Sequence, residues 1–111
     1  MRLKAKFWLE DEEGNSIGEG KIELLKNIKK FGSIHRAAKE MQMSYTQAWS
    51  MIEKVNRCFK KPLVLKRKGG VRGGGSLVTS EGERLLQFYD EVKKEINELL
   101  KIKEKELKDL G

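Results

Sequence analysis

The chain has very few of the side chains that build disulfides, metal centres and nucleophilic active sites. Its 111 residues include one cysteine, Cys58, and one histidine, His35. A lone cysteine excludes a disulfide within the chain, and one histidine with one cysteine cannot form even a minimal structural zinc site. The other acid and base candidates are carboxylates with no spacing that brings two of them together. We therefore expect no enzyme activity, no metal site and no cofactor.

Long hydrophobic runs are also missing. No apolar stretch approaches the roughly 18 residues of a membrane-spanning helix. The first seven residues, MRLKAKF, alternate charged with apolar side chains and lack the apolar block of a signal peptide. The hydrophobic fraction of 38% is enough for one modest core, and the length fits one domain. The sequence thus predicts a single cytoplasmic domain without membrane contact.

Acidic side chains are scarce in the middle of the chain. Residues 21–80 carry fourteen basic and three acidic side chains, whereas the segments on either side are each slightly acidic. The formal net charge of +7 therefore comes from the middle of the sequence. Such a patch suits nucleic acid, because neutralising phosphates releases condensed counterions. A solvated basic surface that keeps the protein soluble is the alternative interpretation.

Residues 1–20 are expected to form a hairpin. Apolar residues occupy every second position at Leu3, Ala5, Phe7 and Leu9, which is the period of a half-buried strand. The turn-rich residues 11–16 then lead to a short return strand near Ile17. From residue 21 the period changes to that of a helix that ends at Gly32. Its apolar face comprises Leu24, Leu25, Ile28 and Phe31.

Residues 33–59 have the pattern of two short capped helices joined by a tight turn. The hydroxyls of Ser33 and Ser44 can each accept a free amide hydrogen at the start of the helix that follows. Small alanines on the first helix let the backbone of a second helix approach closely. The apolar faces comprise Ile34, Ala37, Ala38 and Met41, then Tyr45, Ala48, Trp49, Ile52, Val55 and Phe59. This pattern predicts a helix-turn-helix, with an ordinary helical hairpin as the alternative.

After Pro62 the sequence predicts two strands, over residues 63–65 and 76–79, joined by a basic glycine-rich loop. The loop lacks the Gly-Lys-Ser/Thr of a P-loop and the spacing of a Rossmann motif, so it is not a nucleotide-binding loop. Directly after a helix-turn-helix it is expected to be a wing, over residues 66–76, that contacts phosphates or the minor groove. A hairpin tip that contacts nothing is the alternative. The basic side chains of the loop are Lys66, Arg67, Lys68 and Arg72.

A single long helix is expected from Glu81 to about Lys108, capped by Thr79 or Ser80. At 1.5 Å per residue it would be roughly 40 Å long, against a radius of gyration of about 13 Å for a compact domain of this size. Its far half therefore needs a partner, and a second copy of the chain is the simplest one. The predicted dimer seam steps by four and three residues through Leu85, Tyr89, Val92, Ile96 and Leu99.

Residues 45–59 are the expected recognition helix, because a helix in the major groove reads bases with its outward-facing N-terminal side chains. Gln47 can pair with an adenine edge, Thr46 can present a methyl group to thymine, and Ser50 lies on the same face. Farther along the helix, Lys54 and Arg57 suit phosphates.

Other residues near the expected DNA surface have two interpretations. Ser33 and Ser44 stand at helix N-termini, which favour an anion such as phosphate, but capping alone also explains both. Tyr45 either packs against the domain or contacts the DNA backbone through its hydroxyl. His35 is expected to be a solvated residue on the DNA side.

A set of residues spread from about Lys21 to Tyr89 matches a known pattern. They are Gly32-Ser33-Ile34, Ala37-Ala38-Lys39, Ser44-Tyr45, Ala48-Trp49, Ile52, Asn56, Leu63-Val64, Arg67, Gly69-Gly70, Gly73-Gly74-Gly75, Thr79, Gly82, Arg84-Leu85 and Tyr89. In these residues the chain resembles the N-terminal domain of the molybdate-responsive regulators of the ModE family, a winged helix distantly similar to the LysR-type DNA-binding domain. The resemblance implies a dimer in which N-terminal strands and long helices pack together, with recognition helices in successive major grooves.

The chain departs from the pattern of that family in three respects. Thr46 stands where the family usually has a lysine, so the operator of the family cannot be assumed for this chain. Val71-Arg72 stand where the family tends to have Lys-Gly, which shifts the charge of the wing by one residue. Only helical sequence follows the wing, with no counterpart of the oxyanion-binding domain of the family. Molybdate sensing by this polypeptide is therefore not expected.

Together these features predict a mainly α protein with a small amount of β structure, a winged helix-turn-helix. Its parts are an N-terminal hairpin over residues 1–20, the helix-turn-helix and wing over residues 21–79, and a long C-terminal helix over residues 80–111. The predicted function is a sequence-specific transcriptional regulator that binds double-stranded DNA as a homodimer. An architectural DNA-binding protein of low specificity and a winged-helix protein-interaction module are the alternatives.

Overall fold

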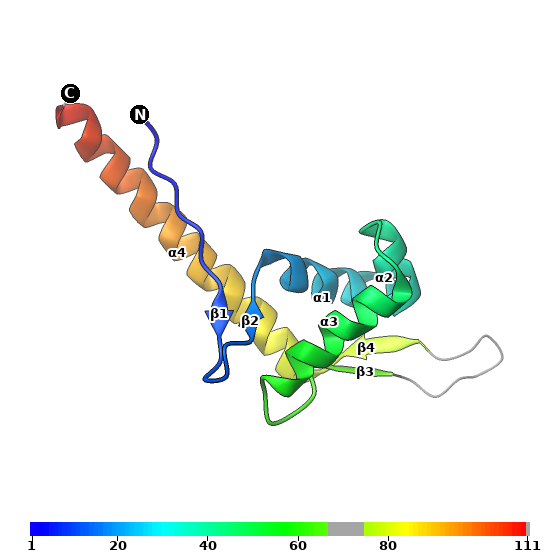
Figure 1. Ribbon diagram of the computed structural model, residues 1–111. Coiled ribbons are helices and arrows are strands. Elements are labelled where there is room, and N and C mark those ends of the chain that lie inside the picture. The colour runs from blue at the N-terminus through cyan, green and yellow to red at the C-terminus, as the bar shows by residue number, and fades with distance from the viewer. Residues whose placement is uncertain (67–74, 111) are drawn as a thin grey trace.

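The computed structural model describes residues 1–66 and 75–110. Three helices and two antiparallel hairpins gather at one end, and a fourth helix projects from them (Figure 1). The elements are β1 (Leu9–Glu10), β2 (Ser16–Ile17), α1 (Glu19–Phe31), α2 (Ile34–Glu40), α3 (Tyr45–Arg57), β3 (Val64–Lys66), β4 (Ser76–Val78) and α4 (Ser80–Leu110). Arg67, Lys68 and Arg72 of the predicted wing lie outside the described residues.

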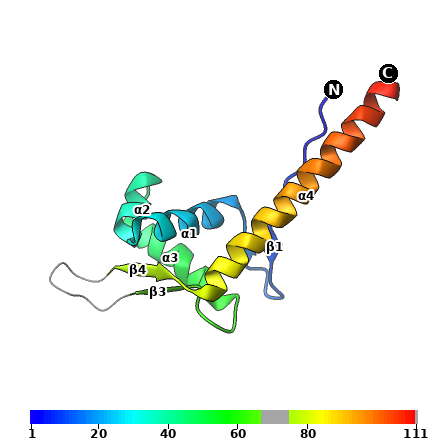
Figure 2. The same ribbon diagram turned by 180° about the vertical axis from the view of Figure 1, so that it is seen from behind.

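The N-terminal hairpin is much shorter than the alternating pattern predicts. Only Leu9 and Glu10 pair with the return strand, opposite Ile17 and Ser16. Residues 1–8 run alongside α4 in both views (Figures 1 and 2). The backbone N–H of Leu3 donates to Glu104 at 2.7 Å. The prediction of a strand from Leu3 was wrong, because within residues 1–66 and 75–110 no second strand pairs with residues 3–8 to complete a ladder.

A small polar turn closes the N-terminal hairpin. One carboxylate oxygen of Asp11 accepts hydrogen bonds from the backbone N–H groups of Glu13 and Asn15, and the other accepts from the Asn15 side chain at 3.1 Å. The hydrogen bonds from Asn15 hold the pKa of Asp11 below its ordinary value of 3.8. The turn therefore satisfies the Asp11 charge locally.

The core lies among α1, α2 and α3, as the helical pattern predicts. Leu24, Leu25 and Ile28 of α1 are fully buried. The small residues Ala37 and Ala38 of α2 are buried beside them, which lets the helices approach closely. One expectation is wrong: α3 ends at Arg57, so Phe59 lies beyond its apolar face and is 39% exposed.

A glycine lets the start of α4 sit directly against Leu63, the residue before β3, and against Val78 of β4. A Cβ atom at Gly82 would lie 2.5 Å from the carbonyl oxygen of Leu63 and 2.6 Å from a side-chain carbon of Val78. Thr79 caps the helix, because its hydroxyl accepts from the N–H of Gly82 at 3.1 Å and donates to the carbonyl of Pro62 at 2.8 Å. Of the two cap candidates, Thr79 is the one that the structure uses.

Most of α4 extends beyond the compact part of the molecule. The helix has 31 residues, and the radius of gyration of 17.2 Å exceeds the roughly 13 Å of a compact domain of about 100 residues. Its buried side chains stop at Tyr89. The long predicted helix is thus confirmed, and it runs on to Leu110.

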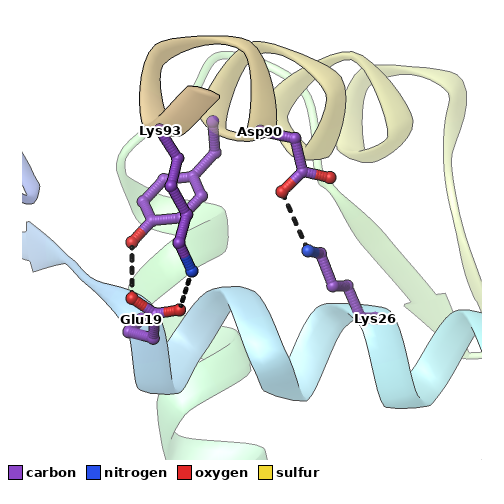
Figure 3. Close-up of polar contacts among 5 residues, drawn as sticks. Glu19, Lys26, Asp90 and Lys93 are labelled. Atoms are coloured by element: carbon purple, nitrogen blue, oxygen red, sulfur yellow. Dashed lines mark hydrogen bonds and ion pairs between the residues drawn. The ribbon is translucent and has the colours of Figure 1, made fainter. Parts of the chain in front are cut away.

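Polar contacts with α1 hold α4 where it leaves the core (Figure 3). Lys26 pairs with Asp90 at 2.9 Å, and Lys93 pairs with Glu19 at 2.6 Å. The Tyr89 hydroxyl donates to Glu19 at 3.4 Å. Burial raises the pKa of Tyr89 above its ordinary value of 10.0, so this hydroxyl keeps its proton at neutral pH.

Candidate nucleic-acid interface

The helix α3 has one buried and one exposed face. Ala48, Ile52 and Val55 are buried against the core. The residues that the sequence analysis assigned to base or phosphate contact lie on the opposite side, and all are exposed. They are Thr46, Gln47, Ser50, Lys54 and Arg57. The last four step along the helix by three, four and three residues, so they form one continuous polar stripe.

The charge of this stripe is positive at its C-terminal end. Lys54 and Arg57 are the basic residues of the last turns of α3. Arg57 lies 3.9 Å from the carboxylate of Glu53, a distance at the limit of an ion pair, and both side chains are well exposed. Such a pair is weak in water and leaves the guanidinium able to meet another anion.

Both predicted N-cap serines do cap their helices. The Ser33 hydroxyl accepts from the N–H of Arg36 at 3.2 Å, and the Ser44 hydroxyl accepts from the N–H of Gln47 at 3.0 Å. Each hydroxyl still has its own hydrogen to donate. The structure thus shows the capping role of both residues, and a phosphate contact stays a prediction.

The turn between α2 and α3 is tight and depends on one unusual backbone conformation. Gln42 has φ of +57°, and it is the only non-glycine residue with positive φ in the described part of the chain. The N–H of Met43 returns to the carbonyl of Ala38 at 3.0 Å. This turn sets the direction in which the N-terminus of α3 points.

A row of stacked side chains connects α2, α3 and the strand that leads into the wing. His35 stacks on Tyr45, with ring centroids 4.3 Å apart. The ammonium of Lys66 lies 4.0 Å from the Trp49 ring centroid and 5.7 Å from that of Tyr45. Tyr45 therefore packs within the domain, against His35 and Lys66. A contact between its hydroxyl and the DNA backbone stays a prediction. His35 is exposed, as expected, and it also stacks on Tyr45, a contact that its helical spacing did not reveal.

Asn56 fixes the strand β3 to the end of α3. Its side-chain oxygen accepts from the N–H of Leu63 at 2.8 Å, and its side-chain nitrogen donates to the carbonyl of Val64 at 3.3 Å. On the other strand, the N–H of Ser76 donates to the carbonyl of Gly32 at 2.9 Å. Hydrogen bonds therefore hold β3 to the end of α3 and β4 to the C-cap of α1.

The predicted dimer seam divides into two parts. Leu85 and Tyr89 are 7% and 2% exposed, because they pack into the core of their own chain. Val92 and Ile96 are half-buried, and Leu99 is 54% exposed. Ile102, which the sequence analysis did not single out, is 58% exposed near Leu99. Within the part of the chain that the structure describes, the apolar side chains of this seam after Tyr89 are thus only half-buried or exposed.

None of the helices in residues 1–66 and 75–110 combines the length and the apolar character needed to span a membrane.

The architecture is a winged helix-turn-helix of the kind found in LysR-type regulators. Among solved structures, a LysR family transcriptional regulator superposes with a TM-score of 0.57 at 13% identity, covering 75% of this chain and 27% of that one. ArgP from Mycobacterium tuberculosis superposes with a TM-score of 0.54 at 18% identity, covering 74% and 29%. At these identities the likeness concerns the fold.

In sequence the chain is ModE-like. It is 43% identical over 74 residues to the transcriptional regulator ModE of Haemophilus influenzae, which covers 67% of this chain and 29% of the relative. It is 38% identical over 88 residues to the molybdenum transport protein ModE of Azotobacter vinelandii, which covers 79% and 33%. The chain thus spans about a third of the length of these curated relatives. No protein-family model matches it.

Proposed function

We propose that the chain is a sequence-specific DNA-binding regulator of transcription that acts as a homodimer. The observation that carries this proposal is the polar stripe of α3, which lies exposed beside the base of a wing rich in lysine and arginine. A helix of this exposure fits the major groove, and cationic neighbours supply the phosphate contacts that fix its register. The similarity to proteins named ModE transcriptional regulator supports the same assignment.

The proposed division of labour follows the position of each side chain. Thr46, Gln47 and Ser50 occupy the exposed N-terminal half of α3, from which side chains reach base edges. Lys54 and Arg57 lie farther from the groove floor and contact phosphates. The wing residues Arg67, Lys68 and Arg72 contact the neighbouring backbone or the minor groove.

The proposed dimer forms through the part of α4 that lies beyond the core. Val92, Ile96 and Leu99 begin this apolar surface, and Ile102 extends it. A second copy would bury these side chains and so remove apolar area from water. Two recognition helices would then contact two half-sites of one operator.

Selection of binding sites from random DNA duplexes tests the function. A specific regulator should enrich a two-fold symmetric motif and prefer it to random duplex by roughly 10³-fold or more, with affinity that falls steeply as salt rises. Salt-sensitive binding without an enriched motif would instead indicate an architectural protein. Absence of DNA binding even at low salt would indicate a protein-interaction module.

A further inference from the structure

The turn between α1 and α2 carries an excess of positive charge. Residues 24–39 contain five basic side chains and no acidic one. Two of the five pair with carboxylates of α4, since Lys26 contacts Asp90 and Lys29 contacts Glu83. Within the described ranges 1–66 and 75–110, the other three form no ion pair: Lys30, Arg36 and Lys39. Their charge is therefore available to an external anion.

Two of these cations share one aromatic ring. The ammonium of Lys30 lies 5.3 Å from the centroid of the Phe31 ring, and the guanidinium carbon of Arg36 lies 5.5 Å from it. Both distances fall within the roughly 6 Å reach of a cation–π contact. Phe31 is half-buried, whereas Lys30 and Arg36 are exposed. The ring thus restricts where the two cations lie, but it has no net charge with which to neutralise them.

The position of Arg36 suits a hydrogen bond to an anion. Side chains of a helix point back toward its N-terminus, and Phe31 lies on that side of Arg36. Glu40 stands one turn farther along α2, and no ion pair between it and Arg36 forms in the described part of the chain. A guanidinium beside a ring still has N–H groups in its own plane, and their spacing matches two oxygens of a phosphate.

Two contacts place this turn between β4 and the N-terminal end of α3. The N–H of Ser76 in β4 donates to the carbonyl of Gly32 at 2.9 Å. His35, the neighbour of Arg36, stacks on Tyr45, the first residue of α3, with ring centroids 4.3 Å apart. In Figure 1, α2 and the β3–β4 hairpin lie at the end of the molecule away from the C-terminus of α4. Neither β4 nor the first eight residues of α3 include an acidic side chain.

We propose that Lys30, Phe31 and Arg36 form a second phosphate-binding site for duplex DNA, distinct from the lysine and arginine in the last turns of α3. Arg36 donates to a backbone phosphate, Lys30 adds a second positive charge, and Phe31 is a positioning residue that holds both. The site rests on the proposed DNA-binding function, because the phosphate belongs to the duplex that the N-terminal half of α3 contacts. Such a contact fixes the register of the helix without reading bases.

The variant Arg36→Gln tests the phosphate contact in the full chain, with an operator obtained by binding-site selection. We expect its Kd at low salt to rise about tenfold, since a charge-assisted hydrogen bond is lost. The slope of log Kd against log salt should fall by about one. Lys101→Gln removes one exposed charge from the far half of α4 and should change neither quantity. An unchanged salt slope for Arg36→Gln would overturn the proposal.

Operators with single methylphosphonate substitutions locate the contact, because each substitution removes the charge of one phosphate. At one position in each half-site the substitution should weaken the parent chain and leave Arg36→Gln unaffected. At the other contacted phosphates both proteins should lose affinity equally. If parent and variant respond alike at every position, Arg36 contacts no phosphate of the operator.

The variant Phe31→Leu tests the positioning role, since leucine keeps apolar bulk and removes the ring. We expect several-fold weaker binding from this change in the parent chain, and no further loss in a Lys30→Gln/Arg36→Gln background. Phe31→Tyr keeps the ring and should retain the parent affinity. Equal losses from Phe31→Leu in both backgrounds would mean that Phe31 contributes packing alone.

Two outcomes separate this proposal from the proposed function. If the parent chain binds no duplex even at low salt, the DNA-binding function itself fails. If the parent binds its operator and Arg36→Gln binds it equally well, only the second phosphate site fails. Because Arg36 is exposed, its substitution decides the matter even where Phe31→Leu does not fold.

Discussion

The ammonium of Lys66, the last residue of β3, lies 4.0 Å from the centre of the Trp49 ring on α3. This contact joins β3 to α3 through a cation and an aromatic face. Trp49 is half-buried, so its ring is fixed by the core and gives Lys66 a defined position. Among the basic residues assigned to the wing, Lys66 is therefore engaged within its own chain.

Substitution of Lys66 should show whether this residue positions the wing or contacts a DNA phosphate. We expect Lys66→Gln to weaken operator binding several-fold, because the wing loses its anchor on Trp49, without changing the slope of log Kd against log salt. Lys68→Gln should lower that slope by about one, as expected when a single lysine–phosphate pair is removed. Fluorescence anisotropy at several salt concentrations measures both. A lower slope for Lys66→Gln would identify Lys66 as a phosphate-binding residue.

Gln47→Ala should relax base preference. The Gln47 side chain is exposed on α3 and can form two hydrogen bonds to an adenine edge, worth about 1–3 kcal/mol of discrimination. Lys54→Ala, on the same stripe but farther along the helix, should weaken binding to all sequences about equally. Competition between the operator and its single-base variants measures the difference. Equal losses for the two variants on every duplex would contradict the assignment of Gln47 to base recognition.

Val92→Asp should dissociate the proposed dimer. A carboxylate introduced into the apolar surface of α4 would be buried without a partner, which costs several kcal/mol. Lys94→Asp provides a control, since Lys94 is an exposed charged residue two positions away on the same helix. Sedimentation at micromolar concentration measures the oligomeric state. If the unsubstituted chain sediments as a monomer, a dimer formed through this surface of α4 is excluded.

Gly82→Ala should destabilise the fold by about 1–3 kcal/mol, the usual cost of overpacking a tight site. The new Cβ would meet the Leu63 carbonyl oxygen at 2.5 Å, and a backbone atom cannot move aside as a flexible side chain does. Gly20→Ala, in the first turn of α1, has nothing within 4 Å of its Cβ and should be neutral or slightly stabilising. Urea denaturation compares the two variants, and similar stabilities would refute the tight packing of α4 on β3.

The contact between Glu19 and Lys93 should make stability depend on pH (Figure 3). The hydrogen bond from Lys93 lowers the pKa of Glu19 below its ordinary value of 4.5, so the stabilisation is present above that pH and is lost as the pH falls through the lowered pKa. The same contact raises the pKa of Lys93 above 10.5, so the stabilisation is also lost at pH values above this. Both side chains are exposed, which keeps the effect small.

The variant Glu19→Gln checks this pH dependence. Its Tm should be lower than that of the parent chain at neutral pH, and the difference should shrink as the pH falls below the ordinary Glu value of 4.5. Thermal unfolding followed by circular dichroism at a series of pH values gives the comparison. A difference in Tm that stays constant down to about pH 3 would show that the charge of Glu19 is not its cause.

Local sequence signals predicted most of the elements because each depends on nearby residues. Ser33 and Ser44 mark helix starts through their own hydroxyls, and Gly32 ends α1 with φ of +66°, a conformation that glycine adopts without strain. The apolar period placed Ala48, Ile52 and Val55 on one face of α3, which left its polar stripe on the other. The expected DNA-facing residues of α3 followed from that division.

Other features depended on contacts between segments that lie far apart in the chain. The alternation of residues 3–9 indicates extended backbone, but whether a strand forms depends on a neighbour, and only Leu9 and Glu10 have one. Tyr89 fits a dimer seam by its spacing, yet it stacks on Phe7 at 4.8 Å within its own chain. Likewise, no pattern in the sequence indicated that His35 would stack on Tyr45.

The sequence by itself therefore determined the order and type of the elements, the helix caps and the concentration of positive charge, because these follow from short-range periodicity and composition. Only the tertiary structure decided which apolar residues of α4 belong to the core and how Asn56 and Lys66 hold β3 to α3. These features depend on contacts between side chains that lie far apart in the sequence. The periodicity of the sequence does not reveal which of these contacts form.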